Sequence, residues 1–94
     1  MKPFNWNKEK NIWLKENRSV SFEDILIYLD NNCLVDDFFH PNQEKYPKQR
    51  IMAVNIKNYI YIVPYIENDV ERYLKTIIPS RKATKKYLGD KHEK

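Results

Sequence analysis

The sequence predicts a single α+β domain in which two helices, a four-stranded antiparallel sheet and a third helix follow one another. Apolar residues recur at helical spacing early in the chain, and from residue 34 they change to the alternation typical of strands. A serine that can cap a helix follows at position 80. Because 94 residues cannot enclose two hydrophobic cores, we expect one domain over residues 1–94, with a frayed tail from about Gly89.

The first two predicted elements are helices. Asn7 is a favourable N-cap for a helix over residues 8–17. Ser21 caps the second helix, and Asp24 stands three residues later, where its carboxylate can complete a capping box. The apolar positions of the second helix follow i, i+3, i+4 and i+7 spacing, and they are Phe22, Ile25, Leu26 and Leu29. This spacing forms one apolar stripe, so we expect that side of the helix to face the core.

Four strands are predicted next, and the last three are joined by short turns. Their ranges are 34–40, 50–56, 59–66 and 70–78. The turns at residues 57–58 and 67–69 are short and polar, which favours antiparallel pairing as a meander, and a polar loop at residues 41–49 precedes them. Pro64 has no backbone donor, so it predicts an edge position or a bulge in the third strand.

Alternation gives the third strand two different faces. Tyrosines dominate one face, made of Tyr59, Tyr61, Val63 and Tyr65, and isoleucines dominate the other. If the isoleucines pack on the helices, the tyrosines face outward, where their rings can stack on nucleic-acid bases. Half-buried packing within the sheet is the alternative use of the same rings. The next strand adds Lys75, but its register is not readable from the sequence.

Positive charge is concentrated near the C-terminus. Residues 1–74 carry 10 basic and 11 acidic side chains, whereas residues 75–94 carry 7 basic and 2 acidic ones. A last helix is expected from the Ser80 cap to Gly89, and its cations are Arg81, Lys82, Lys85 and Lys86. They form like-charge pairs at i, i+4, and two of them oppose the helix dipole, so phosphate or a partner's carboxylates would relieve this repulsion. A solvated basic face is the alternative.

Three polar residues bracket the loop between the first two strands. His40 and Glu44 flank its start, and Arg50 closes it. Attack of an RNA 2′-hydroxyl on the adjacent phosphate needs a base, a cation that stabilises the phosphorane and an acid for the leaving oxygen. Histidine, glutamate and arginine supply these functions without a metal. Polar residues are also common at strand ends, which is the alternative explanation.

Composition argues against several other functions. The single glycine, Gly89, rules out the glycine-rich loops that bind ATP or NAD, so no cofactor is expected. The two histidines, His40 and His92, do not suggest a metal site, and the lone Cys33 is expected to be a buried thiol. No apolar run approaches the roughly 20 residues of a membrane helix, so we expect a cytoplasmic protein that makes no membrane contact.

Four sequence blocks resemble the BrnT family of bacterial type II toxins, which are relatives of the RelE-like ribonucleases. Residues 4–7 read Phe-Asn-Trp-Asn, and Lys10 and Asn11 follow on the first predicted helix. Residues 20–24 read Val-Ser-Phe-Glu-Asp, and residues 77–84 read Ile-Ile-Pro-Ser-Arg-Lys-Ala-Thr. The last block is the most specific, and together the blocks span nearly the whole chain.

This resemblance implies a toxin that cleaves RNA and is neutralised by an antitoxin, usually a ribbon-helix-helix protein that itself binds DNA. Arg50, Arg81 and Lys82 are then expected to stabilise charge in catalysis. His40 or Glu44 are the expected proton carriers, and Tyr61 or Lys75 are the alternative to them. The expected RNA-binding residues are Lys75, Lys85, Lys86 and Tyr61. The alternatives are a catalytically inactive module that binds an antitoxin-like partner or nucleic acid, and a regulator that binds DNA directly.

Overall fold

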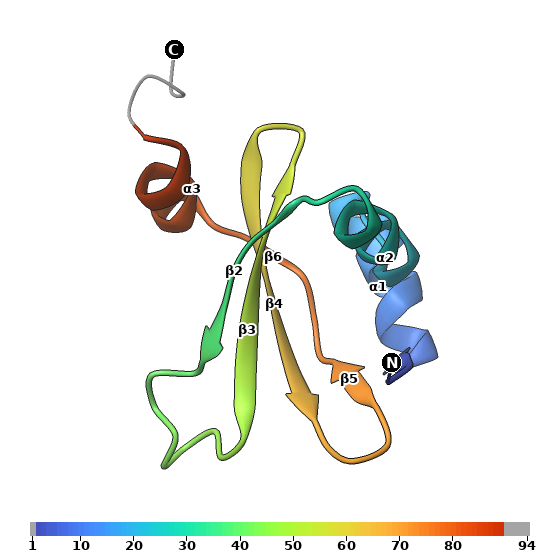
Figure 1. The fold of residues 1–94 in the computed structure, drawn as a ribbon. Helices are drawn as coiled ribbons and strands as arrows, with labels where there is room; N and C mark the ends of the chain where they lie inside the picture. The colour runs from blue at the N-terminus through green and yellow to red at the C-terminus, as the bar shows by residue number, and fades with distance from the viewer. Residues whose placement is uncertain (1, 90–94) are drawn as a thin grey trace.

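The computed structural model describes residues 2–89 and shows an α+β arrangement of three helices on an open six-stranded sheet (Figure 1). The described elements, in chain order, are β1 (Phe4–Trp6), α1 (Lys8–Arg18), α2 (Phe22–Asp30), β2 (Leu34–Phe39), β3 (Gln49–Ile56), β4 (Tyr59–Glu67), β5 (Arg72–Leu74), β6 (Ile78–Pro79) and α3 (Arg81–Leu88). Within this part of the chain, no helix is long and apolar enough to cross a membrane.

The predicted helices are confirmed together with their caps. Asn7 accepts a hydrogen bond from the backbone N of Lys10 at 2.8 Å, and Ser21 and Asp24 form a complete capping box. Ser80 caps α3 by accepting from the backbone N of Ala83 at 3.0 Å, and Gly89 follows α3 with a φ of 82°. The rest of the expected tail, including His92, lies outside the described residues.

The prediction of a four-stranded antiparallel sheet is wrong at one side of the sheet. The strand order is β1-β5-β4-β3-β2, β6 also pairs with β4, and β1 pairs with β5 in parallel. The predicted strand 70–78 is divided into β5 and β6. β1 was missed because three residues show no periodicity, and its pairing with β5 joins distant parts of the chain.

Pro64 explains why the strand predicted over residues 70–78 is divided. Its carbonyl accepts from the backbone N of Lys75 at 2.8 Å, so its nitrogen, which has no hydrogen, faces the same side of β4. At Pro64, β4 therefore has no backbone N–H to donate to the neighbouring segment. This position lies between the end of β5 and the start of β6, so the strand is interrupted there. The expectation of an edge strand is wrong, because β4 lies between β3 and the β5 and β6 segments. The register does shift by one residue beside Pro64, but the extra residue lies in the segment between β5 and β6 and not in β4 itself.

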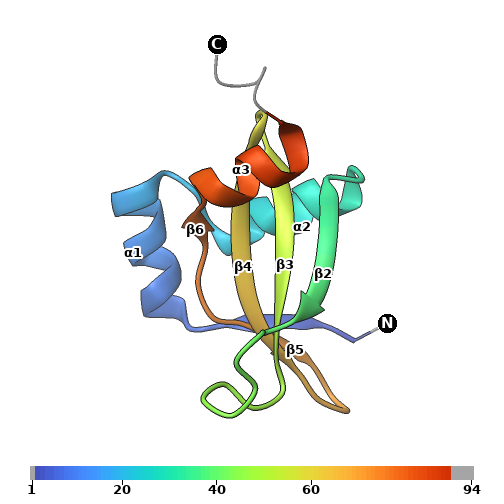
Figure 2. The same ribbon diagram turned by 90° about the vertical axis from the view of Figure 1, so that its left-hand side faces the viewer.

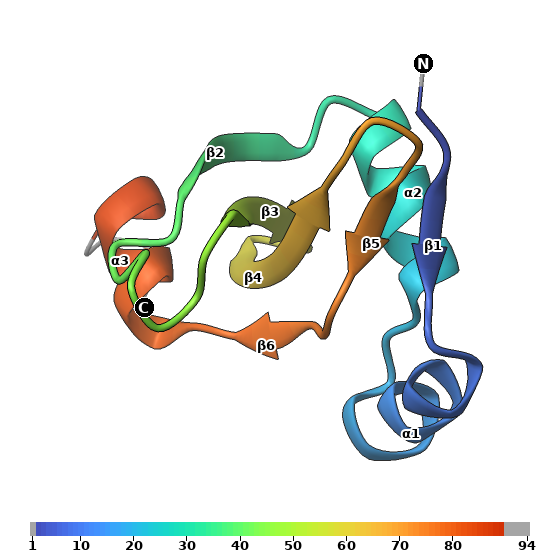
Figure 3. The ribbon, with the colours of Figure 1, turned by 90° about the horizontal axis from the view of Figure 1, so that it is seen from below.

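The helices cover opposite faces of the sheet (Figures 1 and 2). Seen from below, α3 lies on one side of β3 and β4, and α1 and α2 lie on the other (Figure 3). We call the side of α1 and α2 the helix-pair face and the other side the α3 face. On the α3 face, Ile60 is buried, and its backbone N donates to Oγ1 of Thr84 at 2.9 Å, which joins α3 to β4.

The main core lies on the helix-pair face. Its buried members include Leu14, Phe22, Ile25, Met52, Val54, Val63, Tyr65, Leu74 and Ile77. Tyr65 is only 2% exposed, and Tyr61 packs against this core. The tyrosine side of β4 therefore packs on the helices, and an outward row of stacking tyrosines is wrong. Alternation did not decide the matter because helices cover both faces of β4. Cys33 also packs on this core but is only half-buried.

Asn11 joins α1 to the start of α2. Its Oδ1 accepts from the backbone N of Phe22 at 2.8 Å, and its Nδ2 donates to Oε1 of Glu23 at 2.7 Å. Asn11 is 5% exposed, and the N–H of Phe22 belongs to the first turn of α2, where no carbonyl of the same helix can accept it. The Asn11 amide therefore pairs a donor that is buried away from water.

We expect Asn11→Ala to lower the free energy of unfolding by about 1–3 kcal/mol, because the N–H of Phe22 loses its acceptor inside the protein. Urea unfolding followed by circular dichroism measures this change. Asn17→Ala is the matched control on the same helix, since the Asn17 amide only donates to the Trp13 carbonyl on the exposed side. Its change should stay within about 0.5 kcal/mol. Equal losses in the two variants would contradict the role given to Asn11.

Candidate functional site

A pocket of about 350 Å³ opens on the helix-pair face, between the end of α2 and the ends of β3, β4 and β5. We call it the Arg50 pocket. Its charged lining residues are Asp30, Asp37, Arg50, Glu67 and Arg72. Phe4, Leu29, Met52 and Tyr65 contribute apolar surface. The pocket thus combines aromatic rings, guanidinium groups and carboxylates, as ligand sites commonly do.

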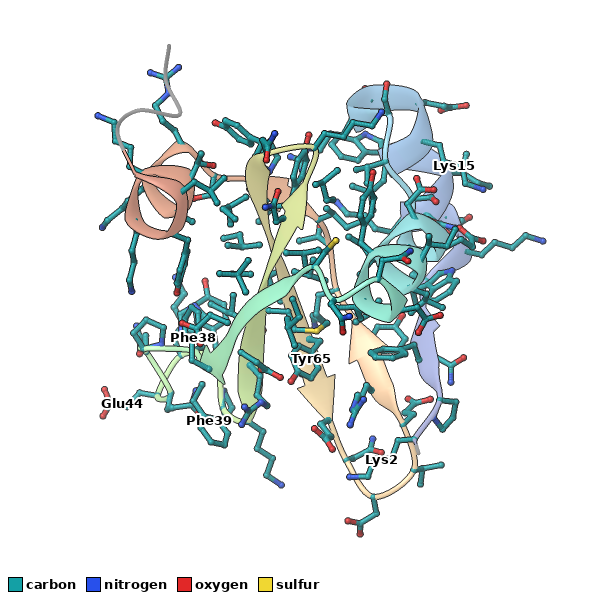
Figure 4. All side chains as sticks on the ribbon, turned by 45° about the horizontal axis from the view of Figure 1, so that its top comes forward. Lys2, Lys15, Phe38, Phe39, Glu44 and Tyr65 are labelled. Atoms are coloured by element: carbon teal, nitrogen blue, oxygen red, sulfur yellow. The ribbon has the colours of Figure 1, made fainter. Side chains whose placement is uncertain are left out.

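Three neighbouring strands bring Asp37, Arg50 and Tyr65 into contact. The Tyr65 hydroxyl lies 2.8 Å from each carboxylate oxygen of Asp37 and donates its proton to this group. Nε of Arg50 donates to the Tyr65 hydroxyl at 3.0 Å and to Oδ1 of Asp37 at 3.2 Å. Figure 4 shows Tyr65 pointing from the sheet toward the helix-pair side. The three side chains fix one another's orientation, because each contacts the other two.

Burial and hydrogen bonding together determine the protonation of Tyr65 and Arg50. Burial raises the pKa of Tyr65 to about 12, and its hydrogen bond to Asp37 acts in the same direction, while the hydrogen bond from Arg50 lowers it in part. The pKa of Arg50 is raised, chiefly by its hydrogen bond to Tyr65. At neutral pH, Tyr65 is therefore a neutral donor and Arg50 a cation, so the Asp37 carboxylate is held by two donors.

Two guanidinium groups lie beside aromatic rings at the pocket. The guanidinium carbon of Arg50 is 4.4 Å from the centre of the Phe39 ring, and that of Arg72 is 5.4 Å from the centre of the Phe4 ring. Phe39 is 59% exposed, and it lies at the end of β2 in Figure 4. Rings and guanidinium planes of this kind are the surfaces on which unstacked bases pack.

The charges of the pocket nearly cancel. Three carboxylates and two guanidinium groups line it, and Lys2 donates to Oε2 of Glu67 at 2.8 Å. That hydrogen bond is the main reason why the pKa of Glu67 is lowered. Nε of Arg72 lies 3.7 Å from Oε1 of the same carboxylate. A ligand in this pocket would therefore be held by directed contacts rather than by net charge.

A second surface lies on the α3 face. A groove of about 140 Å³ runs between α3 and the sheet, with a mainly apolar lining that includes Phe38, Ala53, Ile62, Ala83 and Tyr87. Lys82 and Lys86 also line it. α3 (Arg81–Leu88) contains four cations and no acidic residue. The Tyr87 hydroxyl donates to Oδ2 of Asp36 at 2.5 Å and joins the helix to β2. We call this surface the α3 groove.

The predicted site residues do not form one cluster. Arg50 lines the pocket on the helix-pair face, whereas Lys82 lines the groove on the opposite side of the sheet. The His40 ring packs on Tyr46 with their centres 4.4 Å apart, and its Nδ1 accepts from the backbone N of Asn42. Glu44 is exposed on the loop and lies well away from Tyr65 in Figure 4.

The expected RNA-binding residues are also dispersed. Lys85 and Lys86 are exposed on α3, and Lys75 is exposed in the segment between β5 and β6. Tyr61 is half-buried against the core and makes an edge contact with Tyr59. The three lysines are therefore accessible to a polyanion, but the Tyr61 ring is committed mainly to packing.

Two residues of the Arg50 cluster, Asp37 and Tyr65, were missed in the sequence. The signal was present in the two-residue turn at residues 57–58, which pairs Ile56 with Tyr59. When residues are paired outward along the two strands from this turn, Tyr65 falls opposite Arg50, as the structure shows. Asp37 had no comparable signal, because the loop of residues 40–48 leaves the pairing of β2 and β3 open.

The raised pKa of Tyr65 predicts a pH range in which stability is lost. An unfolded tyrosine ionises near pH 10, whereas folded Tyr65 keeps its proton to about pH 12. The folded state binds more protons between these values, so this contribution is complete below pH 10 and falls as the pH rises toward 12.

Tyr65→Phe removes this titration. Between pH 9 and pH 11, we expect its free energy of unfolding to fall by about 1 kcal/mol less than that of the wild type. Urea unfolding at both pH values measures the difference. An equal fall in both proteins would show that Tyr65 does not titrate in this range.

No protein-family model matches the chain, and no curated protein or solved structure matches it either. Its function is therefore inferred from the Arg50 pocket, the α3 groove and the sequence blocks described above.

Proposed function

We propose that this protein is the toxin of a type II toxin–antitoxin pair, with a RelE-like fold, and that it cleaves RNA in the Arg50 pocket. The observation that carries this proposal is the contact between Asp37, Arg50 and Tyr65 in the wall of an open pocket. The resemblance of the sequence to the BrnT family supports it. The cluster differs from the set expected from the sequence, because only Arg50 belongs to both.

The cluster supplies two of the three groups that metal-independent RNA cleavage needs, a base and a cation that stabilises the phosphorane. Asp37 accepts the proton of the 2′-hydroxyl, whose oxygen then attacks phosphorus, and Arg50 stabilises the charge that develops on the phosphorane. Tyr65 is a positioning residue, because it is buried and orients both of these side chains.

His40 remains the proposed proton donor to the leaving 5′-oxygen. Its loop follows Phe39, whose ring lies against the Arg50 guanidinium, and the protonated imidazole is the form that can give a proton to the leaving oxygen. Glu44 is the weaker candidate for a proton carrier, since it is exposed on the loop without a described partner.

The second part of the proposal is an antitoxin that docks in the α3 groove. The groove has an apolar lining and lysines beside it, so it fits a protein segment that carries both apolar and acidic side chains. A ribbon-helix-helix antitoxin is the proposed partner, and DNA is contacted only through it. Arg81 and Lys82 thus move from catalysis to partner binding, in which Lys86 takes part because it also lines the groove. Lys75, Lys85 and Lys86 stay the proposed contacts to the RNA backbone.

A catalytically inactive binding module is the second candidate. Two ion pairs within the pocket favour this candidate, because they neutralise charges that catalysis would need. Arg50 lies 3.2 Å from Asp37, and Arg72 lies 3.7 Å from Glu67. In this case the same contacts only stabilise the fold, and the α3 groove carries the function.

Cleavage of labelled RNA, measured in the presence of a metal chelator, tests which face of the sheet carries the active site. We expect Arg50→Gln to lower the rate by about 100-fold, because Arg50 stabilises the developing charge. Arg81→Gln makes the same change of charge on the α3 face and should alter the rate only a few-fold. Asp37→Asn, which nearly preserves the shape of the side chain, should resemble Arg50→Gln. Circular dichroism verifies that each variant is folded.

The opposite pattern would place the reaction on the α3 face. Activity that survives Arg50→Gln but is lost in Arg81→Gln contradicts the assignment of the active site. No cleavage by the wild type, tested on both structured and unstructured RNA, supports the binding module.

The antitoxin is expected from the reading frame beside the gene. This antitoxin can be produced together with the toxin and its affinity for each variant measured. We expect Lys82→Glu combined with Lys86→Glu to weaken antitoxin binding by at least about tenfold, because two charge pairs at the groove become repulsive. Lys8→Glu combined with Lys48→Glu makes the same charge change at exposed positions away from α3 and should leave the affinity near that of the wild type. Isothermal titration calorimetry compares the variants, and equal losses would indicate a general charge effect rather than docking at the groove.

A further inference from the structure

The Arg50 pocket contains more polar groups than the proposed cleavage step uses. Asp37 and Arg50 act on the RNA backbone, whereas Asp30, Arg72 and Phe4 line the same cavity without a role in that step. These three residues come from the end of α2, from β5 and from β1. We call them the Asp30 side of the pocket.

Asp30 is a carboxylate that lacks a donor. It is exposed at the last position of α2, and its side chain makes no hydrogen bond or ion pair with another residue in the range 2–89. The C-terminal end of a helix carries partial negative charge, and the last turn of α2 contains no basic residue to offset it. A ligand that donates hydrogen bonds to Asp30 would therefore remove an unfavourable arrangement.

Arg72 presents its guanidinium group beside an aromatic ring. The parallel pairing of β1 and β5 places Phe4 next to Arg72 in register, and the guanidinium carbon lies 5.4 Å from the centre of the ring. Glu67 lies near Nε of Arg72, at 3.7 Å, while the terminal nitrogens of the guanidinium have no described partner. Those nitrogens form a planar pair of donors at the pocket.

We propose that the Asp30 side of the pocket binds one base of the RNA and selects guanine, an inference that rests on the proposed ribonuclease function. Guanine carries two adjacent donors, N1–H and the 2-amino group, which match the two oxygens of one carboxylate. It also carries two adjacent acceptors, O6 and N7, which one arginine can bind in bidentate fashion. Asp30 accepts hydrogen bonds from N1–H and the 2-amino group, and Arg72 donates hydrogen bonds to O6 and N7.

The other bases do not match both groups. Adenine places a donor and an acceptor on each of these edges, cytosine places a donor beside an acceptor, and uracil has one donor between two acceptors. A cavity of about 350 Å³ is within the usual size of small-ligand sites, and it is continuous with Asp37 and Arg50. A guanine bound there places a neighbouring phosphate at the cluster, so cleavage occurs next to guanine.

Binding of nucleoside monophosphates to the full chain tests this selection without requiring cleavage. GMP, AMP, CMP and UMP are titrated separately and followed by amide chemical shifts. We expect GMP to bind about tenfold more tightly than the other three. Inosine monophosphate lacks the 2-amino group and loses one of the two donors to Asp30, so its affinity should fall between those of GMP and AMP.

Asp30→Asn should remove the preference, because an amide cannot accept both donors of guanine. Asp69→Asn makes the same change in the exposed turn between β4 and β5 and should keep the preference. Equal affinities for the four nucleotides overturn the inference, as does a preference that survives Asp30→Asn. Competition by inorganic phosphate that is as strong as that by GMP also overturns it, since the pocket would then recognise phosphate alone.

The cleavage assay separates this inference from the function that it extends. A GMP preference without any cleavage of RNA contradicts the proposed ribonuclease and leaves the base selection standing. Cleavage at equal rates next to all four bases contradicts the base selection and leaves the ribonuclease standing.

Discussion

The register of the β3–β4 hairpin is the constraint on which the rest of the molecule depends. Lys57 and Asn58 both have positive φ, 52° and 67°, as a two-residue type I′ turn requires, and the side chain of Asn55 accepts from the backbone N of Asn58. The turn fixes every pair of the hairpin from residues 56 and 59 to residues 49 and 66. A slip of one residue would send Arg50 and Tyr65 to opposite faces and abolish their contact.

Coverage of the sheet on both faces follows from the composition of this hairpin. Both faces of β4 are apolar enough to be buried, one by α1 and α2 and the other by α3. The helices stop short of the end of the sheet where Arg50 lies, so polar groups there remain accessible at the pocket. The same sheet thus provides a core at its centre, a polar pocket on one face and a basic groove on the other.

Local patterns predicted the features that depend on neighbours in sequence. The caps at Asn7, Ser21 and Ser80 and the tight turn of the hairpin needed only a few adjacent residues. β1 and the division between β5 and β6 were not predictable in this way, since three-residue strands have no periodicity and Pro64 acts on a strand distant in sequence. The site shows the same division. Arg50 and the α3 cations were recognised in the sequence, whereas Asp30, Asp37 and Arg72 come to line one pocket only through tertiary packing.

Separation of the pocket and the α3 cations has a consequence for inhibition. Layers packed on a sheet lie about 10 Å apart, and charges in water are screened over about 8 Å at physiological ionic strength. The cations of α3 therefore attract polyanions to the molecule but act only weakly on a phosphate bound beside Arg50. If the proposed antitoxin binds α3 through acidic groups, it removes this attraction and leaves the pocket itself open. Complete inhibition of the proposed ribonuclease then requires this antitoxin to extend past the edge strand β2 to the pocket side, where the exposed Phe39 ring lies against Arg50.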